Sequence, residues 1–326
     1  MWVEWPFPRA PRPPTSEALA KTRRSLLKSL AGLAVVGGGA WLVREHVLWP
    51  EPPVLFSGPD SGWLPFTTRF QSAVTVRAML NGVRVNALVD SGAQYSVVDR
   101  AFAERLNLPA SLAPPLLAYG AGGNPQIGRG AAVDVSVGAL RLPALKAAVL
   151  NLGPISQEAG LSAPLILGQD VLHELVADID FPGRRMRFLP QQGFVVPENA
   201  VETPSRRRGR ALFVEVTVDG ERFEVMLDTG ASFALGLTDK AADAAGLLAG
   251  RKITPSRSVV LGGVAAGGVV TLDTIRFGEI ELRKSPVHIF PGQPLPGFPD
   301  GLLGFGALAP YRALLDHGHG RLLLIG

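Results

Sequence analysis

The residues Leu88-Val89-Asp90-Ser91-Gly92-Ala93 bring an aspartate out of an apolar strand and directly into a glycine turn. The same arrangement returns 138 residues later as Met226-Leu227-Asp228-Thr229-Gly230-Ala231. A buried strand holds the residue at its end in a fixed place, and two carboxyl groups held in this way can share one proton and act as acid and base. The repeated pattern therefore indicates two-carboxylate chemistry, with Asp90 and Asp228 as the reacting groups.

The repeat extends on both sides of the aspartates. Upstream, Asn81-Gly82 and Asp219-Gly220 are also 138 residues apart, and each is a two-residue hairpin signal between alternating strands. Downstream, apolar segments that end in Gly168 and Gly304 follow their aspartates by 78 and 76 residues. Because several landmarks keep the same order and spacing, the sequence predicts two copies of one domain.

These motifs resemble those of the retropepsin-like aspartic proteases, here as two lobes in one chain over residues 64–326. The resemblance implies an all-β, bilobal acid-protease fold with two pseudo-symmetric β-barrel lobes and short helices. It also implies that the hydroxyls of Ser91 and Thr229 hydrogen-bond across the pseudo-two-fold axis and lock the two turns together. Gly92 and Gly230 would let backbone N–H groups approach the carboxylates.

A glycine cluster lies between each aspartate and its later Leu-Gly segment. Gly122 and Gly123 belong to the first cluster, and Gly262 and Gly263 to the second. The resemblance implies that both clusters are hairpin flaps that close over a bound peptide, since glycine permits a tight turn and a close backbone approach. An ordinary hairpin tip is the alternative interpretation.

The landmarks divide the chain into five parts. We expect a basic leader with an apolar segment at 1–49, a Pro-rich spacer at 50–65, lobes at 66–190 and 211–326, and a linker at 191–210. The basic run in the linker, Arg206-Arg207-Arg208, is expected to be solvated. Short helices are predicted at 96–106 and at 238–247, the second with Thr238 as its N-cap. By the resemblance, the apolar strands 185–189 and 321–325 would build a sheet that connects the lobes.

Composition excludes several classes of protein. The chain has 326 residues, of which 47% are hydrophobic, so two cores can be filled, and it has no cysteine, so disulfides and thiol catalysis are excluded. The first 28 residues hold six basic and two acidic side chains, which accounts for the whole net charge of +4. The rest lacks the positive charge that nucleic-acid binding requires.

The leader carries Thr22-Arg23-Arg24-Ser25-Leu26-Leu27-Lys28 before an apolar run at 29–43. This segment resembles a bacterial twin-arginine export signal, and an ordinary signal-anchor is the alternative. Both interpretations leave the N-terminus in the cytoplasm and the lobes outside, in the periplasm or at the outer face of the inner membrane. We expect the leader to stay attached as a transmembrane helix, with the spacer holding the lobes off the membrane.

The expected activity is that of an aspartic endopeptidase that acts on extended polypeptide segments. Water held between Asp90 and Asp228 would attack the peptide carbonyl, without a metal or another cofactor. Because both lobes belong to one chain, a monomer is expected. Ala93 and Ala231 stand where pepsin-like enzymes usually carry a hydroxyl donor, and losing that donor raises the carboxyl pKa values. The expected pH optimum is therefore mildly acidic to near neutral.

Two other functions remain open at this stage. A peptide-binding protein of the same fold could have kept the cleft without catalysis. A serine hydrolase is suggested by Gly230-Ala231-Ser232-Phe233-Ala234, which nearly matches a nucleophile elbow but lacks its last glycine.

The remaining acids and the histidines are expected to have structural and not catalytic roles. The acids Asp170, Asp180 and Asp316 are expected to anchor helix starts and turns. The five histidines show no metal-ligand pattern, and His317 and His319 are expected to be solvated.

Overall fold

The computed structural model describes residues 49–68, 73–109, 116–118, 120, 124–153, 155, 162–292 and 298–326. The expected twin-arginine signal and apolar anchor lie outside these residues. Glu51–Gly326 forms one compact unit. In the described ranges, no helix combines the length and the apolar character that crossing a membrane would take.

The first lobe is built around six strands that pair in a closed ring. The ring runs β3, β4, β9, β5, β8 and β7, and β7 pairs back onto β3. The short strands β1 and β6 extend it at two edges. The elements are β1 (Leu55–Phe56), β3 (Thr75–Leu80), β4 (Val83–Val89), β5 (Val97–Asp99), α2 (Arg100–Arg105), β6 (Leu116–Ala118), β7 (Gln126–Val137), β8 (Leu140–Leu150), β9 (Leu165–Leu167) and α4 (Gln169–Leu172).

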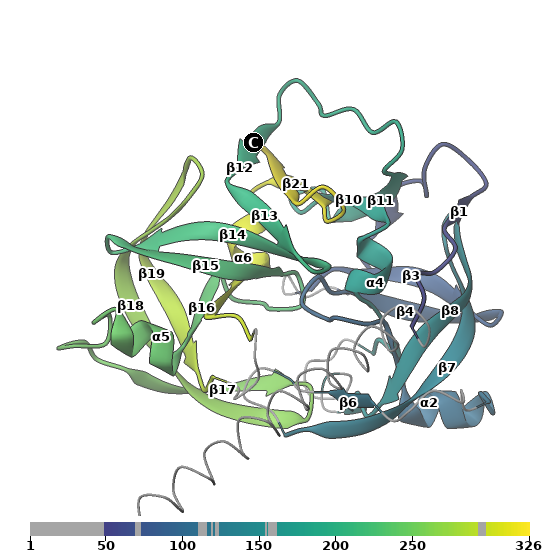
Figure 1. Ribbon diagram of the computed structural model, residues 1–326, viewed down its shortest axis with the longest axis horizontal. Helices are drawn as coiled ribbons and strands as arrows, with labels where there is room; N and C mark the ends of the chain where they lie inside the picture. The colour runs from purple at the N-terminus through teal and green to yellow at the C-terminus, as the bar shows by residue number, and fades with distance from the viewer. Residues whose placement is uncertain are drawn as a thin grey trace, which may run out of the picture. The chain divides into compact units, whose positions relative to one another are not determined.

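The second lobe repeats this ring strand for strand. It runs β14, β15, β20, β16, β19 and β18, and β18 pairs back onto β14. Figure 1 shows its strands, green to yellow, as a group apart from those of the first lobe. The elements are β13 (Ser205–Arg208), β14 (Ala211–Val218), β15 (Glu221–Asp228), β16 (Leu235–Thr238), α5 (Asp239–Ala244), β17 (Thr254–Val260), β18 (Gly263–Phe277), β19 (Ile280–Phe290), β20 (Gly301–Gly304) and α6 (Phe305–Leu308). The predicted mainly β fold with two repeated lobes is confirmed.

Local sequence explains these strands. In β14, Leu212, Val214, Val216 and Val218 are fully buried and alternate with residues on the other face of the sheet. β-branched side chains suit this pleated, half-buried surface. Glu215, on the other face, is exposed. The period of two therefore places one face of β14 in the core of the lobe.

The predicted hairpin turns are confirmed by their backbone angles. Asn81 and Gly82 have φ values of 47° and 79°, and Asp219 and Gly220 have 47° and 96°. Positive φ at both central residues is what a two-residue type I′ hairpin requires, and Asn, Asp and Gly tolerate it best. These turns fix the register of the hairpin whose second strand ends at each aspartate of the repeat.

A third sheet joins the lobes by main-chain hydrogen bonds. In it β10 of the first lobe pairs with β21 of the second lobe, from Val176 opposite Asp316 to Asp180 opposite Arg312. Strands β11 and β22 flank this pair, as the sequence predicted for residues 185–189 and 321–325. Figure 1 shows these strands near the top of the view. The sheet order is β12 (Val201–Thr203), β22 (Arg321–Ile325), β21 (Arg312–Asp316), β10 (Leu175–Asp180), β11 (Arg185–Pro190) and β2 (Leu64–Pro65).

A buried carboxylate reinforces the joint between the lobes. Asp178 on β10 is fully buried, and it accepts hydrogen bonds of 2.7 Å from Nε and Nη2 of Arg312 on β21. Nε of Arg187 on β11 lies 2.8 Å from the same carboxylate. Because a buried charge requires a partner, Asp178 ties the position of one lobe to that of the other.

Residues 50–65 differ from the expected free spacer. Leu55–Phe56 pairs with β8, and Leu64–Pro65 pairs with β11. The ring of Trp63 lies 4.5 Å from the guanidinium carbon of Arg185 and 4.7 Å from that of Arg187. Much of this segment is therefore packed against the first lobe.

The basic run of the linker also differs from expectation. Residues 205–208 form the edge strand β13, which pairs with β14. Arg206 and Arg208 both form ion pairs with Glu224, and Arg207 donates to the Gly318 carbonyl at 3.1 Å. The three arginines are exposed, as expected for a solvated run, but they belong to a β-strand, and Glu224, two strands away, offsets part of their charge.

The helix predicted at 96–106 begins later than expected. Val97 and Val98 belong to β5, in keeping with their β-branched side chains. Asp99 then caps α2 by accepting a hydrogen bond from the Phe102 N–H at 3.1 Å. In the second lobe Thr238 accepts from the Ala241 N–H at 3.2 Å, which confirms it as the N-cap of α5.

Replacing Leu303 by alanine tests the packing beneath the second aspartate. Leu303 is fully buried on β20, between β15 and β16. The variant Leu303→Ala should lose about 2–5 kcal/mol of unfolding free energy in urea denaturation, because it leaves a cavity. Val195→Ala, at a position that is 81% exposed, should change it by less than about 0.5 kcal/mol. Equal losses in both variants would contradict the assigned core.

Candidate active site

Each aspartate of the repeat stands where a buried strand ends. Strand β4 leads to Asp90 and pairs in parallel with β9, and β15 ends at Asp228 and pairs in parallel with β20. The Asp90 N–H donates to the Leu167 carbonyl at 3.0 Å. In both lobes, therefore, the strand that leads into the Leu-Gly landmark lies alongside the strand that leads to the aspartate.

The two turns are locked together by reciprocal hydrogen bonds. The Ser91 hydroxyl donates to the Leu227 carbonyl at 2.8 Å and accepts from the Thr229 N–H at 3.0 Å. The Thr229 hydroxyl donates to the Val89 carbonyl at 2.7 Å and accepts from the Ser91 N–H at 3.0 Å. Both side chains are fully buried. These four bonds cross between the lobes, as the resemblance implied.

The structure brings the two carboxyl groups together. A Cβ atom on Gly92 would lie 2.5 Å from Cγ of Asp228, and one on Gly230 would lie 2.7 Å from Cγ of Asp90. The two carboxyl groups also hydrogen-bond to one another. The glycines therefore do more than free their own N–H groups, because each leaves room for the aspartate of the other lobe.

Each carboxyl group accepts two backbone hydrogen bonds from its own turn. Oδ1 of Asp90 accepts from the N–H groups of Gly92 at 2.9 Å and Ala93 at 3.1 Å. Oδ1 of Asp228 accepts from Gly230 and Ala231 at the same two distances. These donors stabilise the ionised form of a carboxyl group.

Burial opposes that stabilisation. It raises the pKa of Asp90 above its ordinary value. Burial also raises the pKa of Asp228, well above its ordinary value, and the neighbouring charge of Asp90 adds to the rise. Two carboxyl groups in contact cannot both ionise easily, so the pair holds one proton at a pH at which isolated aspartates would be fully ionised.

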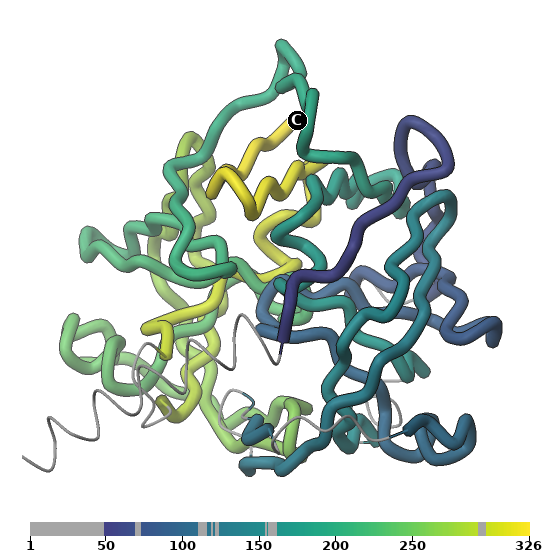
Figure 2. The backbone as a smooth tube through the Cα atoms, turned by 45° about the vertical axis from the view of Figure 1, so that its right-hand side comes forward, coloured from purple at the N-terminus to yellow at the C-terminus, as the bar shows by residue number. Residues whose placement is uncertain are grey.

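The two predicted flap regions approach one another at their tips. A Cβ atom on Gly120 would lie 2.3 Å from the Leu261 carbonyl oxygen, and one on Gly262 would lie 2.0 Å from that of Asn124. Figures 1 and 2 show β6 and the hairpin of β17 and β18 near one another at the lower edge of the view. Gly262 has a φ of 91° and Gly263 begins β18, whereas Gly122 and Gly123 lie outside the described residues.

Two stretches of the chain, residues 76–171 and 214–307, match the family model of aspartyl proteases, and together they cover more than half of its length. The chain belongs to the aspartyl protease family. Each stretch falls within one lobe, so the predicted two-lobed, retropepsin-like organisation is confirmed. One similar solved structure is a retropepsin-like aspartic protease from Rickettsia conorii. Its sequence identity is 23% over 38% of this chain and 90% of that chain, and the TM-score is 0.30. No curated protein matches the chain.

One buried residue of this aspartyl protease was missed by the sequence analysis. Gln169, directly after Gly168, is 4% exposed, and its Nε2 donates to the Ser91 carbonyl at 2.8 Å. Its position next to the Leu-Gly landmark was the available signal. Nothing in the spacing could show that its side chain would reach the turn of Asp90.

The three other acids act as local anchors, as expected. Oδ1 of Asp170 accepts from the N–H and hydroxyl of Ser96 at 2.9 and 2.8 Å. Asp180 accepts from the Gly183 N–H at 2.8 Å, and Asp316 accepts from the His319 N–H at 3.2 Å. Asp170 is almost completely buried, and burial raises its pKa to about 6.

The expectation of a solvated His317 is wrong. His317 is fully buried, Nδ1 lies 3.1 Å from the Arg210 carbonyl, and burial lowers its pKa to about 4. The turn that follows β21 is covered by the strand β13 and its flanks, which the sequence analysis treated as linker. His319, by contrast, is largely exposed and pairs with Asp316 at 2.9 Å.

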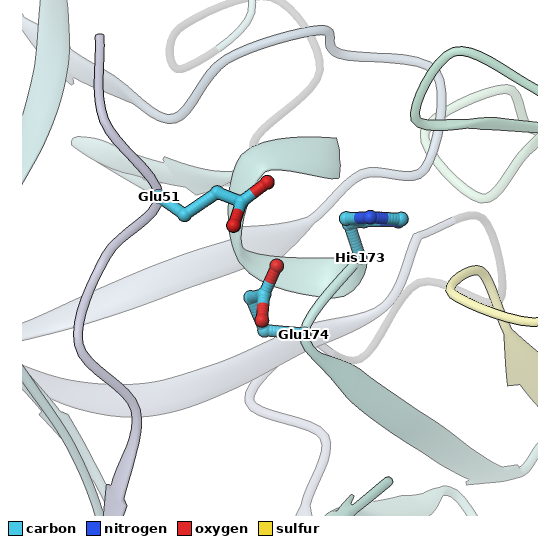
Figure 3. A group of neighbouring side chains, drawn as sticks. All are labelled: Glu51, His173 and Glu174. Atoms are coloured by element: carbon cyan, nitrogen blue, oxygen red, sulfur yellow. The ribbon is translucent and has the colours of Figure 1, made fainter. Parts of the chain in front are cut away.

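Glu51, His173 and Glu174 form a group that could hold a metal ion. One ligand atom of each lies within 4.8 Å of the others, near the end of α4 (Figure 3). Nη1 of Arg207 lies 3.4 Å from Nε2 of His173, and Nη2 of Arg210 lies 3.8 Å from a Glu51 carboxylate oxygen. These guanidinium groups bring positive charge to the same place, which disfavours a cation.

Gly262→Ala tests the contact between the flap tips. The added methyl group would meet the Asn124 carbonyl in the closed arrangement, and alanine is also strained at positive φ. We expect a statine-type inhibitor to bind roughly tenfold more weakly, a loss of about 1.4 kcal/mol, because the methyl group keeps the two tips from closing together over the inhibitor.

The matched control is Gly220→Ala. Gly220 has a φ of 96°, but no atom lies within 4 Å of an added methyl group. Calorimetric titration with the inhibitor should therefore give an affinity close to that of the unmodified protein. Equal weakening by both variants would show that backbone strain, and not the tip contact, is responsible.

Asp170→Asn tests the buried carboxyl group. The folded pKa of about 6 lies above the ordinary 3.8, so the protonated form stabilises the fold below pH 3.8 and this contribution is lost as pH rises through 6. The asparagine variant does not titrate. Between about pH 4 and pH 8 it should therefore gain up to roughly 3 kcal/mol of stability relative to the unmodified protein.

Denaturation at several pH values measures this gain, and Asp180→Asn serves as its control. At Asp180 burial acts to raise the pKa, but the hydrogen bonds from Arg185 and Gly183 lower it overall. The Asp180 variant should therefore lose stability relative to the unmodified protein as pH rises. A constant difference for Asp170→Asn at all pH values would contradict the assigned titration.

Proposed function

We propose that this aspartyl protease is an endopeptidase that hydrolyses extended polypeptide segments by means of water activated between Asp90 and Asp228. The observation that carries the proposal is the contact of these two half-buried carboxyl groups, which the four reciprocal hydrogen bonds of Ser91 and Thr229 hold in place. Such a pair retains one proton, so it offers a base and an acid at the same place.

The chemistry follows from that shared proton. The ionised carboxyl group removes a proton from water while the water oxygen bonds to the peptide carbonyl carbon. The protonated carboxyl group donates its proton to the carbonyl oxygen, so a neutral tetrahedral intermediate forms. Its C–N bond then breaks as the amine nitrogen takes up a proton from one carboxyl group, while a hydroxyl of the intermediate returns a proton to the other carboxyl group. No covalent link to the protein is formed, and the dyad ends with the same number of protons as at the start.

The substrate class follows from the flaps. The tips of the two hairpins approach one another closely. We propose that they lie over the dyad, with their backbone groups beside a chain bound beneath them. A segment in β conformation can hydrogen-bond to such groups on both sides, whereas a folded helix satisfies its own backbone. We therefore propose unstructured or locally unfolded polypeptides as substrates. The raised pKa values of the pair support work at mildly acidic to near-neutral pH.

A serine hydrolase has less support. Ser232 is exposed, and among the described residues no histidine hydrogen-bonds to its hydroxyl. A peptide-binding protein without catalysis would have the same fold. It would not, however, require two carboxyl groups in contact, an arrangement that costs stability because ionisation of one opposes ionisation of the other.

Substitution of either aspartate separates these functions. Asp90→Asn and Asp228→Asn should each lower the rate of cleavage of an unfolded protein by roughly 10²- to 10⁴-fold, because one partner can no longer exchange a proton. The assay uses residues 51–326 or the full chain, with mass spectrometry of the products. Ser232→Ala and added EDTA should leave the rate unchanged.

Each alternative gives a distinct result in that assay. Cleavage that survives both asparagine variants but not Ser232→Ala would favour the serine hydrolase. Binding of a statine-type inhibitor without any cleavage would favour the peptide-binding protein. Loss of cleavage with EDTA would point to a metal, for which Glu51, His173 and Glu174 are the described candidates.

We also propose that residues 1–49 export the protein to the bacterial periplasm and anchor it at the inner membrane. The support is the arginine pair Arg23-Arg24 before an apolar run. A reporter fused to these residues should reach the periplasm, and replacing both arginines by lysine should abolish export by the twin-arginine route. Unchanged export would favour the ordinary signal-anchor.

A further inference from the structure

Gln169 connects the helix after the Leu-Gly landmark with the catalytic turn and with the other lobe. Its Nε2 donates to the Ser91 carbonyl at 2.8 Å and also lies 3.7 Å from Sδ of Met226, two residues before Asp228. The side chain is 4% exposed. Water therefore hardly competes for these contacts, and the amide keeps a fixed orientation.

The acceptor of this hydrogen bond belongs to the peptide group that donates to Asp90. The Ser91 carbonyl and the Gly92 N–H are the two ends of one peptide unit, and that N–H donates to Oδ1 of Asp90 at 2.9 Å. A hydrogen bond to a peptide carbonyl polarises the unit and makes its N–H a stronger donor. A stronger donor stabilises the ionised form of the carboxylate that accepts from it. Gln169 therefore acts on Asp90 through one peptide group.

The second lobe lacks this arrangement although its backbone is the same. Phe305 occupies the equivalent place, since its N–H donates to the Ala231 carbonyl at 2.8 Å as the Gln169 N–H does to the Ala93 carbonyl. The Phe305 ring packs edge-on against Phe181, with centroids 4.9 Å apart. A phenyl ring has no N–H to offer to the Thr229 carbonyl. The peptide group between Thr229 and Gly230, whose N–H donates to Asp228, therefore accepts no hydrogen bond from the side chain at position 305.

We propose that Gln169 is a positioning residue that makes Asp90 the ionised member of the pair and leaves the shared proton on Asp228. Asp90 then accepts the proton from water, and Asp228 donates to the substrate carbonyl. The roles of Asp90 as base and Asp228 as acid rest on the proposed peptidase function. The assignment of the shared proton to Asp228 does not depend on that function. Among the described residues, the groups that act on each carboxyl are the other carboxyl and the N–H donors of its own turn.

The test is a titration of both carboxyl carbons by NMR in protein labelled at aspartate, with Asp90→Asn and Asp228→Asn for assignment. In the unmodified protein, the Asp90 carbon should ionise at the lower pH. Gln169→Met keeps the length of the side chain but removes its donors, so the Asp90 titration should move to higher pH. On the acidic limb of the rate profile, kcat/KM should then fall roughly twofold to fivefold.

Phe305→Met is the matched control in the other lobe. It places the same residue at the equivalent position but removes no donor, so both titrations should stay where they are. Equal shifts in Gln169→Met and Phe305→Met, or no shift in a Gln169→Met protein that melts normally, would overturn the proposal. A thermal melt of each variant separates the electrostatic effect from loss of structure.

A second measurement needs no variant at position 169. The Gly92 amide proton should resonate further downfield than the Gly230 amide proton in the unmodified protein, because its peptide group is polarised. Equivalent shifts for the two glycines would also overturn the proposal. If the titrations behave as expected while no polypeptide is cleaved, the peptidase function fails and the role of Gln169 stands.

Discussion

The structure depends on holding two like carboxyl groups in contact, each of them partly shielded from water. Left to themselves, Asp90 and Asp228 would separate, because ionisation of one opposes ionisation of the other and water solvates both better than protein does. The bonds between Ser91, Thr229 and the strands beneath them prevent this separation. Each lobe thus contributes hydrogen bonds to the turn of the other.

The rest of the fold maintains that contact. The β10–β21 pairing and the buried Asp178 hold the lobes in one register at the third sheet. Within each lobe, a closed ring of strands fixes the strand that carries the aspartate from both sides. Displacement of either carboxyl group would weaken proton transfer, because proton transfer requires hydrogen-bond distances. Under the proposed function, a rigid scaffold at both levels is therefore part of the chemistry.

The sequence was most informative where backbone geometry restricts residue type. The two aspartates, the hairpin turns at Asn81-Gly82 and Asp219-Gly220 and the Leu-Gly landmarks were found because few residues fit such positions. Contacts between distant side chains were not predictable in this way. The burial of His317 and the hydrogen bond from Gln169 to Ser91 depend on which segments pack beside them, and a local sequence pattern does not contain that information. Strands β1 and β2 were missed because two-residue strands give no periodicity.

The covalent connection between the lobes affects how the pairing of the two halves responds to dilution, and it also affects which sequences the two halves can recognise. Two halves on separate chains would come apart on dilution, whereas halves joined through residues 191–210 meet at a constant effective concentration. Duplicated halves on one chain are also free to diverge, as Gln169 and Phe305 have done at equivalent positions. Under the proposed function, unlike surfaces can then contact the residues on either side of a scissile bond, so the preferred sequence need not be palindromic.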